Sequence, residues 1–280
     1  MRIGVVGSGT MGAGIAQVFA QAGYDVAMQD VSPAALDAAR RRIEQSLGKF
    51  VEKGMLAAAD RDAALGRVAM TPALEAFSGV DFVVEAIVED VDAKRRLFAR
   101  LDEILPKSAI LSSNTSSISI TVLASATKRP EQVLGMHFMN PVPLMKLVEL
   151  IRGQATGDAA LAAARDLCSR LGKTAVEAAD YPGFIANRIL MPMINEAAFA
   201  VMEGVGTPEA IDTVMKLGMN HPMGPLTLAD FIGLDVCVAI LDVLHEGLGD
   251  PKYRACPLMR RLVAAGHLGR KTGRGFHTYG

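Results

Sequence analysis

One histidine and one glutamate stand in an otherwise mostly apolar segment, HFMNPVPLMKLVEL, residues 137–150. If its two apolar runs pair as antiparallel strands around Pro141, residues whose numbers sum to about 286 face one another, and His137 and Glu149 meet that condition. A carboxylate beside an imidazole fixes the tautomer of the ring and raises its basicity, so the pair could take a proton from a hydroxyl group. A buried pair can equally be a satisfied part of the core, and the pair alone leaves both interpretations open.

A glycine-rich turn near the amino terminus could bind a dinucleotide, which would accept a hydride while such a base takes the proton. In GSGTMG, Gly7, Gly9 and Gly12 have the G-x-G-x-x-G spacing between a strand-like run and a helical pattern. These glycines permit a tight turn, an approach of backbone amides to a pyrophosphate, and close helix packing, respectively. Asp30 ends the next strand-like run, where a carboxylate can bind both ribose hydroxyls of an adenosine and repel a 2′-phosphate. The pattern predicts NAD rather than NADP; a glycine turn without ligand and a turn-forming aspartate are the alternatives.

Five polar residues follow the ends of successive predicted strands. They are Glu89, Lys94, Asn114, Ser116 and His137. Ligands of open α/β sheets bind beyond the carboxyl ends of the strands, so we expect these side chains to line the same crevice as the glycine turn. Each of them, taken singly, could also be a solvated loop residue.

The elements that would position these residues alternate along the first half of the chain. Strands are expected at 2–7, 24–30, 80–86, 109–113, 132–138 and 146–151, and helices at 11–23 and 33–54. This alternation predicts an α/β fold with a Rossmann-type doubly wound sheet. From residue 181 onward the strand pattern disappears, and apolar stripes punctuated by glycine and proline predict an all-α domain. We expect the boundary near Pro182 and Gly183, giving domains of residues 1–183 and 184–280.

Composition narrows the classes of function. The 280 residues carry a formal charge of -1 and are 50% hydrophobic, which favours a small-molecule ligand over nucleic acid or an anionic membrane. Three scattered cysteines, Cys168, Cys237 and Cys256, show no metal-ligand spacing, and neither do the five histidines, so no metal is expected. Neither a signal-peptide pattern nor an apolar run long enough for a membrane span occurs, so we expect a cytoplasmic protein.

Seven motifs, in this order, resemble the L-3-hydroxyacyl-CoA dehydrogenase family, close to its bacterial members that act on 3-hydroxybutyryl-CoA. The motifs are GSGTMG, VVEAIVED, SSNTSS, HFMNPVPLMKLVEL, PGFIANRIL, HPMGPLTLADFIGLD and GRKTGRGF. They span essentially the whole chain. The resemblance implies reversible NAD-dependent oxidation of a short-chain L-3-hydroxyacyl-CoA to the 3-oxoacyl-CoA, and a homodimer formed through the C-terminal helical domain.

The resemblance also implies roles for the matching positions. His137 would be the general base and Glu149 its orienting partner. Ser116 would touch both the substrate oxygen and the cofactor, and Asn187 would complete the catalytic site. The implied cofactor contacts are Gly7, Ser8, Gly9, Thr10, Met11, Gly12, Asp30, Glu89, Lys94, Asn114, Ser116, Asn140 and Lys271. The implied coenzyme A contacts are Ser46, Lys53 and Ser116.

Several assignments stay open on sequence alone. Ser46 and Lys53 lie seven residues apart on one predicted helix and can face one ligand, with a solvated basic face as the alternative, and residues 40–42, all arginine, are expected to be ordinary surface charge. Met139 and His277 stand where phenylalanine and tyrosine are common in the family. Two further functions remain: a dehydrogenase of a free hydroxy acid or sugar acid on the same fold, and a nucleotide-binding protein without catalytic activity.

Overall fold

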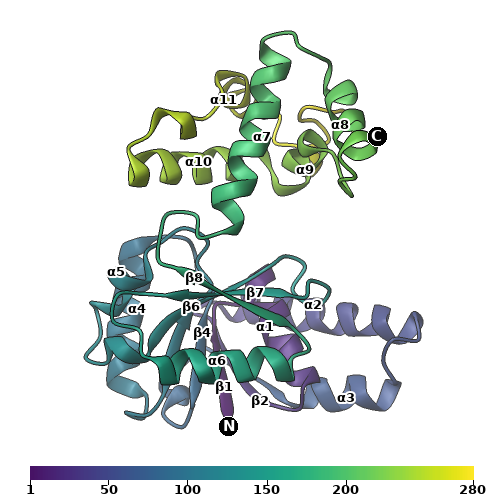
Figure 1. Cartoon of the computed structure of the whole chain (residues 1–280). Coiled ribbons are helices and arrows are strands. Elements are labelled where there is room, and N and C mark those ends of the chain that lie inside the picture. Colours follow the sequence, from purple (N-terminus) through teal and green to yellow (C-terminus); the bar gives the residue numbers. More distant parts are fainter. The chain divides into compact units, whose positions relative to one another are not determined.

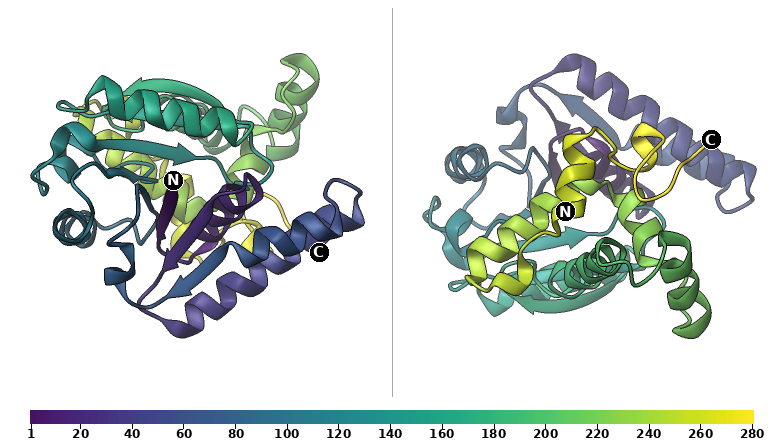
Figure 2. Two further views of the ribbon diagram at one scale, coloured as in Figure 1. Left: turned by 90° about the horizontal axis from the view of Figure 1, so that it is seen from below. Right: turned by 90° about the horizontal axis from the view of Figure 1, so that it is seen from above.

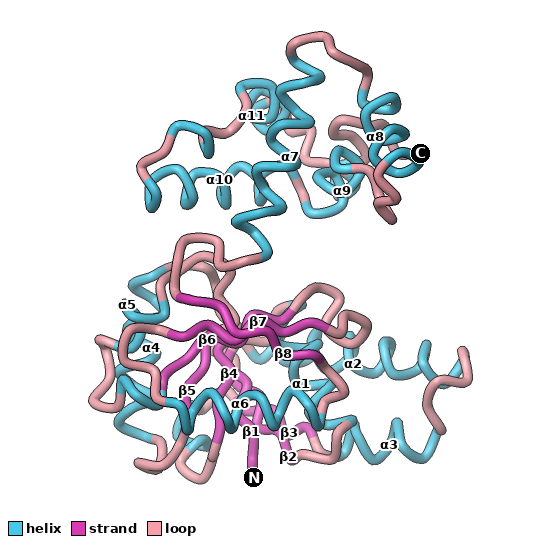
Figure 3. Tube along the Cα trace, viewed as in Figure 1, coloured by secondary structure: helices cyan, strands magenta, loops and turns pink.

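The computed structural model describes residues 1–280, which divide into two compact units, Met1–Asp180 and Tyr181–Gly280 (Figure 1). The first unit contains one eight-stranded sheet with helices, and every strand of the molecule lies in it (Figure 3). The second unit is helical. The predicted combination of a Rossmann-type sheet and an all-α second part is confirmed.

The bounds of the elements are as follows. The strands are β1 (Arg2–Val6), β2 (Asp25–Gln29), β3 (Val68–Thr71), β4 (Phe82–Glu85), β5 (Ile110–Ser113), β6 (Val133–Phe138), β7 (Leu147–Arg152) and β8 (Thr174–Ala179). The α-helices of the first unit are α1 (Thr10–Gln21), α2 (Pro33–Glu52), α3 (Ala58–Gly66), α4 (Val91–Ile104), α5 (Ile120–Ala124) and α6 (Asp158–Arg170). Those of the second unit are α7 (Ala186–Met202), α8 (Pro208–Gly218), α9 (Pro225–Ile232), α10 (Leu234–Leu248) and α11 (Pro257–Ala264). Short 3₁₀ turns are η1 (Leu74–Phe77), η2 (Pro130–Gln132), η3 (Pro251–Tyr253) and η4 (Arg270–Thr272).

The order of the strands fixes where a ligand can bind. The sheet runs β3-β2-β1-β4-β5-β6-β7-β8, and all neighbours are parallel except the antiparallel pair β6 and β7. From β1 the chain goes first to β2 on one side and later to β4 on the other. In open α/β sheets this reversal of direction opens a crevice beyond the carboxyl ends of the strands, and here it lies at β1 and β4.

Two strands, β3 and β8, were not predicted, and they are the two edges of the sheet. β8 has the sequence TAVEAA, with only one buried residue, and β3 is the four-residue run VAMT. An edge strand buries less surface than a central one, so its sequence carries little of the β-branched, apolar pattern that marks β1 or β4.

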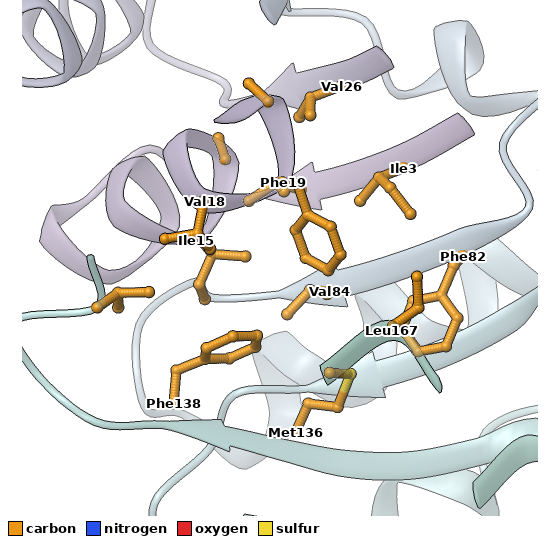
Figure 4. Packing of buried hydrophobic residues seen from close by; sticks show 14 of the residues in the cluster. Ile3, Ile15, Val18, Phe19, Val26, Phe82, Val84, Met136, Phe138 and Leu167 are labelled. Atoms are coloured by element: carbon orange, nitrogen blue, oxygen red, sulfur yellow. The ribbon is translucent and has the colours of Figure 1, made fainter. Parts of the chain in front are cut away.

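Helices cover both faces of the sheet (Figure 2). On one face α1, α2 and α6 pack on β1, β2 and β6, where Phe19 meets Phe138 edge to face with 6.5 Å between ring centroids (Figure 4). On the other face, α5 packs against β6 through Ile120, close to Gly135. These buried apolar contacts hold the strand ends in fixed register.

Local sequence explains the start of α2, the helix that flanks the crevice. The hydroxyl of Ser32 accepts a hydrogen bond from the backbone N–H of Ala35, and Pro33 occupies the first turn, as predicted. One face of the helix is buried in the core through Leu36, Ala39, Ile43 and Leu47. The opposite face is left for solvent and ligands.

The second unit has its own core, formed mainly by α7, α9, α10 and α11. Its C-terminal tail is held by two buried aspartates. Asp230 accepts hydrogen bonds from the backbone N–H of His277 and the hydroxyl of Tyr279, and Asp212 lies 2.9 Å from His277 Nε2. We call these four residues the tail clamp. None of the helices in the chain combines the length and the apolar character needed to cross a lipid bilayer.

Candidate active site

The turn after β1 is shaped by two glycines, Gly7 and Gly12, that a residue with a side chain could not replace without a clash. Gly7 has φ +97°, and a Cβ there would lie 2.4 Å from the carbonyl oxygen of Ala86. A Cβ on Gly12 would lie 1.9 Å from the carbonyl oxygen of Gly7, whereas a Cβ on Gly9 would meet nothing within 4 Å. Gly9 is also the N-cap of α1 and offers no side chain to its first N–H groups. Open space before uncapped helix amides fits an anionic pyrophosphate.

Asp30 lies just beyond β2 and faces this turn. Its carboxylate accepts hydrogen bonds from the backbone N–H and the hydroxyl of Ser8, at 2.9 and 2.7 Å, and from the backbone N–H of Ser32 at 3.1 Å. Partial burial acts to raise the pKa of Asp30, but these hydrogen bonds outweigh it and hold the pKa below its usual range. Asp30 is therefore a fixed negative charge at neutral pH, suited to ribose hydroxyls and unsuited to a 2′-phosphate.

A cavity of about 700 Å³ opens between the glycine turn and α2. Its size falls in the range of about 300 to 1,000 Å³ typical of small-molecule sites. Its walls combine the polar turn and Asp30 with apolar side chains. The lining residues are Val6, Gly7, Ser8, Gly9, Gln29, Asp30, Val31, Ala35, Ala38, Arg42, Ala86, Ile87, Val88 and Leu97. An adenosine attached to a pyrophosphate fits this distribution, so these residues fit NAD.

His137 and Glu149 face one another on β6 and β7, as their predicted register requires. His137 Nδ1 lies 2.8 Å from Glu149 Oε2, and both side chains are buried. Because an ionised carboxylate can only accept, the pair places the proton on Nδ1 and leaves Nε2 as the basic nitrogen of the neutral ring. The strand carrying His137 is held in turn by Asn114, whose Oδ1 accepts from the backbone N–H of Phe138 at 2.9 Å.

The loop after β5 is organised around Glu89. Its Oε1 accepts hydrogen bonds from the hydroxyl of Thr115 at 2.5 Å and from the backbone N–H groups of Ser116 and Ser117 at 2.9 and 3.2 Å. Its other oxygen lies 3.2 Å from the ammonium of Lys94. Burial acts to raise the pKa of Glu89, but the charge of Lys94 and the hydrogen bonds lower it overall. Of the predicted residues, Glu89 thus follows β4, Asn114 and Ser116 follow the adjacent strand β5, and Lys94 joins them from α4.

A second, smaller cavity of about 160 Å³ lies between α1, α2 and the turn after β6. Ser46, Thr10 and Asn140 line it, which brings one predicted coenzyme A contact beside two predicted cofactor contacts. Arg42 lines both this cavity and the larger one. Arg42 is exposed, as expected of a surface charge, and it also forms part of the wall of both cavities. Its place four residues before Ser46, on the same helix face, was the signal in the sequence.

The remaining predicted residues have simple surroundings. Lys53 is the exposed C-cap of α2. In the second unit, Asn187 is buried near the start of α7, and the ammonium of Lys271 lies 2.6 Å from a carboxylate oxygen of Asp235. The roles expected of these three residues stay predictions. No cluster of three or more histidine, cysteine or acidic side chains is arranged to hold a metal ion.

Comparisons with known proteins cover both units. Residues 2–181 match the family model described as 3-hydroxyacyl-CoA dehydrogenase, NAD binding domain, and residues 183–279 match the corresponding C-terminal domain. A probable 3-hydroxybutyryl-CoA dehydrogenase of Deinococcus radiodurans is 58% identical, with 100% of both chains covered. A 3-hydroxybutyryl-CoA dehydrogenase of Bradyrhizobium diazoefficiens is 52% identical over 99% of this chain and 95% of the relative. The crystal structure of (S)-3-hydroxybutyryl-CoA dehydrogenase from Ralstonia eutropha superposes with a TM-score of 0.97 at 48% identity, covering 100% and 99% of the two chains.

Proposed function

The chain belongs to the 3-hydroxyacyl-CoA dehydrogenase family, and we propose that it catalyses the reversible NAD-dependent oxidation of a short-chain L-3-hydroxyacyl-CoA to the 3-oxoacyl-CoA. It is an oxidoreductase, and NAD is its cofactor. The observation that carries the proposal is the pair His137 and Glu149, 2.8 Å apart at the end of β6, in the same sheet as a glycine turn that fits a dinucleotide.

The residues divide the reaction as follows. Nε2 of His137 takes the proton from the C3 hydroxyl of the substrate, and Glu149 stabilises the imidazolium that forms. Bound NAD would supply the acceptor for the hydride that leaves C3. Ser116 and Asn187 donate hydrogen bonds to the reacting oxygen, and the same groups act in reverse during reduction.

The cofactor contacts form a second set of proposed roles. The glycine turn from Gly7 to Gly12 binds the pyrophosphate, and Asp30 binds the adenosine ribose and disfavours NADP. The remaining proposed cofactor contacts lie at later strand ends and in the second unit. They are Glu89, Lys94, Asn114, Ser116, Asn140 and Lys271.

The coenzyme A part of the substrate is assigned to the outer face of α2. Ser46 lines the smaller cavity, and Lys53 adds a positive charge two turns further along the helix. Arg42 has no ion pair with a carboxylate, and its guanidinium is suited to a phosphate group at the border of the two cavities. This arrangement supports a thioester of coenzyme A over a free acid.

Three further proposals concern the domain organisation, the oligomeric state and the cellular location. The predicted boundary between residues 183 and 184 falls three residues after the division of the structure between Asp180 and Tyr181, and we propose that the first part binds NAD and the helical part contributes to the substrate site. The helical part forms a homodimer, which its large exposed apolar side chains Leu217, Ile189 and Val214 support, at 82%, 67% and 58% exposure. A cytoplasmic location is in keeping with the bacterial relatives.

The test is a set of initial rates for the oxidation of NADH. We expect rapid turnover with acetoacetyl-CoA, slower turnover with longer 3-oxoacyl-CoAs, and little with acetoacetate. The charge reversal Lys53→Glu is expected to raise KM for acetoacetyl-CoA at least about tenfold, with kcat little changed. Rates as high with acetoacetate would favour the free-acid dehydrogenase, no turnover with any of them would favour a nucleotide-binding protein, and a preference for NADPH would overturn the role of Asp30.

A further inference from the structure

Glu85, the last residue of β4, is a fully buried carboxylate in the middle of the sheet, with 0% exposure. Its three predecessors in the strand, Phe82, Val83 and Val84, are apolar core residues. Glu85 Oε1 accepts from the ammonium of Lys94 at 2.6 Å and from the backbone N–H of Ile87 at 2.7 Å. Well-packed apolar residues often stabilise a core as well as a buried ion pair does, so stability alone does not account for Glu85.

Two chains of contacts lead from Glu85 to the same loop. In the first, Lys94 bridges Glu85 and Glu89, with Nζ 2.6 Å from one carboxylate and 3.2 Å from the other, and Glu89 accepts from the backbone N–H of Ser116. In the second, the hydroxyl of Ser113 donates to Glu85 Oε2 at 2.5 Å and accepts from the backbone N–H of Thr115 at 3.1 Å.

The two chains close into a ring, because the hydroxyl of Thr115 also donates to Glu89 at 2.5 Å. The ring links β4, β5 and α4, and its outermost member is the irregular segment Thr115–Ser117. An irregular loop has no ladder of backbone hydrogen bonds of its own to fix it. Here its backbone donors are held by Glu89 and Ser113; Ser113 binds Glu85 directly, and Glu89 is connected to Glu85 through Lys94.

We propose that Glu85 is a positioning residue, which acts through Lys94 with Glu89 and through Ser113 to hold Ser116 in the orientation that hydride transfer requires. The inference rests on the proposed function, in which Ser116 contacts the substrate oxygen and the cofactor. Lys94 is part of the same ring, since its ammonium contacts two carboxylates and its side chain is only 1% exposed. A displacement of a reacting group by about 1 Å can lower a rate about a hundredfold, so a rigid ring around this loop has a direct effect on turnover.

The test compares Glu85→Gln and Ser113→Ala with a matched control, Asp102→Asn. Asp102 and Arg129 form another buried ion pair of the first unit, 2.6 Å apart, which reaches the backbone around Pro106 at the opposite ends of the strands. Ser113→Ala removes only one hydroxyl and leaves every charge in place, so it keeps the test valid if Glu85→Gln does not fold. Each variant is assayed with acetoacetyl-CoA and NADH, and with NADH deuterated at the transferred position, and its melting temperature is recorded.

We expect kcat to fall about tenfold to a hundredfold in Glu85→Gln and about threefold to tenfold in Ser113→Ala, with KM changed less than about threefold. The deuterium isotope effect on kcat should increase in both, because misplacement slows the hydride step itself. A lower proportion of folded enzyme would leave the isotope effect unchanged. Asp102→Asn should lower the melting temperature without altering kcat or the isotope effect.

Unchanged kcat and isotope effect in both ring variants would overturn the inference while leaving the proposed function intact. Equal losses in the ring variants and Asp102→Asn, with no rise in the isotope effect, would also overturn it, since that is the behaviour of general destabilisation. Failure of the proposed function is distinguished by the wild-type protein, which would then show no turnover of acetoacetyl-CoA.

Discussion

Two histidines of this chain are each paired with a buried carboxylate, one in each unit. On β6, His137 Nδ1 lies 2.8 Å from Glu149, and in the tail clamp His277 Nε2 lies 2.9 Å from Asp212. Pair geometry alone would give the two the same chemistry. Their surroundings differ, and the comparison shows that the function of such a pair is decided by what else the two residues contact.

Asp212 already has a structural task. Its carboxylate accepts hydrogen bonds from the backbone N–H groups of Leu226 and Thr227, both at 2.9 Å, and thereby caps the start of α9. His277 is bound from both sides, because its Nδ1 lies 3.6 Å from Glu209. Both ring nitrogens of His277 therefore face carboxylates, an arrangement that stabilises a fold and offers no nitrogen to a substrate. Glu149, in contrast, contacts Nδ1 of a histidine near the end of β6, a strand of the sheet that carries the glycine turn.

Removing the imidazole at position 137 should have the largest effect on catalysis. We expect His137→Ala to lower kcat for acetoacetyl-CoA reduction about a thousandfold or more, because the reacting oxygen loses its proton donor and acceptor. The affinity for NADH, measured by the fluorescence of the bound NADH, should change less than about twofold, since cofactor binding depends on the glycine turn and Asp30. Turnover within tenfold of the wild type would contradict the assignment of the base.

Neutralising Glu149, the carboxylate partner of His137, should have the second-largest effect on catalysis. Glu149→Gln keeps the shape of the side chain but removes the charge that stabilises the imidazolium, and we expect kcat to fall about a hundredfold. The matched control is Glu177→Gln on the neighbouring strand β8, where the carboxylate is exposed and binds Arg152. An equal loss in both variants would show that the effect arises from the sheet rather than from the pair.

The tail clamp should respond in stability rather than in turnover. His277→Ala removes the hydrogen bond to Asp212, and we expect the free energy of unfolding to fall by about 1 to 2 kcal/mol. Thermal melting of the purified variant measures this. An unchanged melting temperature would show that His277 does not stabilise the helical unit. The structural role assigned to its pair with Asp212 would then be wrong.

The smallest expected effect is on stability at alkaline pH, and it involves only Tyr279 of the helical unit. Burial and the hydrogen bond to Asp230 raise the pKa of Tyr279 from its usual 10.0 to about 12. Since the folded pKa exceeds the unfolded one, this contribution to stability is fully present below pH 10 and is lost as the pH rises through about 12. The difference in melting temperature between the wild type and Tyr279→Phe should therefore shrink between pH 9 and pH 11.5. A constant difference would contradict the role of this hydroxyl.

Much of the fold and of the candidate site could be predicted from the sequence, because the patterns that indicate them are local. The glycine turn, the central strands and the register of His137 with Glu149 all follow from patterns that are local, such as residue spacing, apolar runs and a proline turn. Family resemblance added Asn187 and the coenzyme A contacts, which no local pattern identifies, and it gave a catalytic role to Ser116, which the strand-end pattern had already placed in the crevice.

What the sequence did not reveal depends on contacts between distant segments. The edge strands β3 and β8 take part in the sheet through backbone pairing, and their side chains carry little apolar signal. Glu85 was not singled out, because a glutamate at the end of a strand is unremarkable until Lys94, nine residues later, and Ser113, 28 residues later, are seen to meet it. Arg42 became a candidate phosphate contact only from the structure, in which it lines two neighbouring cavities.

The most direct test of the central claim measures the oxidation of L-3-hydroxybutyryl-CoA by NAD with His137→Ala and His277→Ala in the same assay, normalised to folded protein. We expect kcat to fall about a thousandfold in His137→Ala and to stay within about threefold of the wild type in His277→Ala. Comparable activity in the two variants, or a larger loss in His277→Ala, would contradict it.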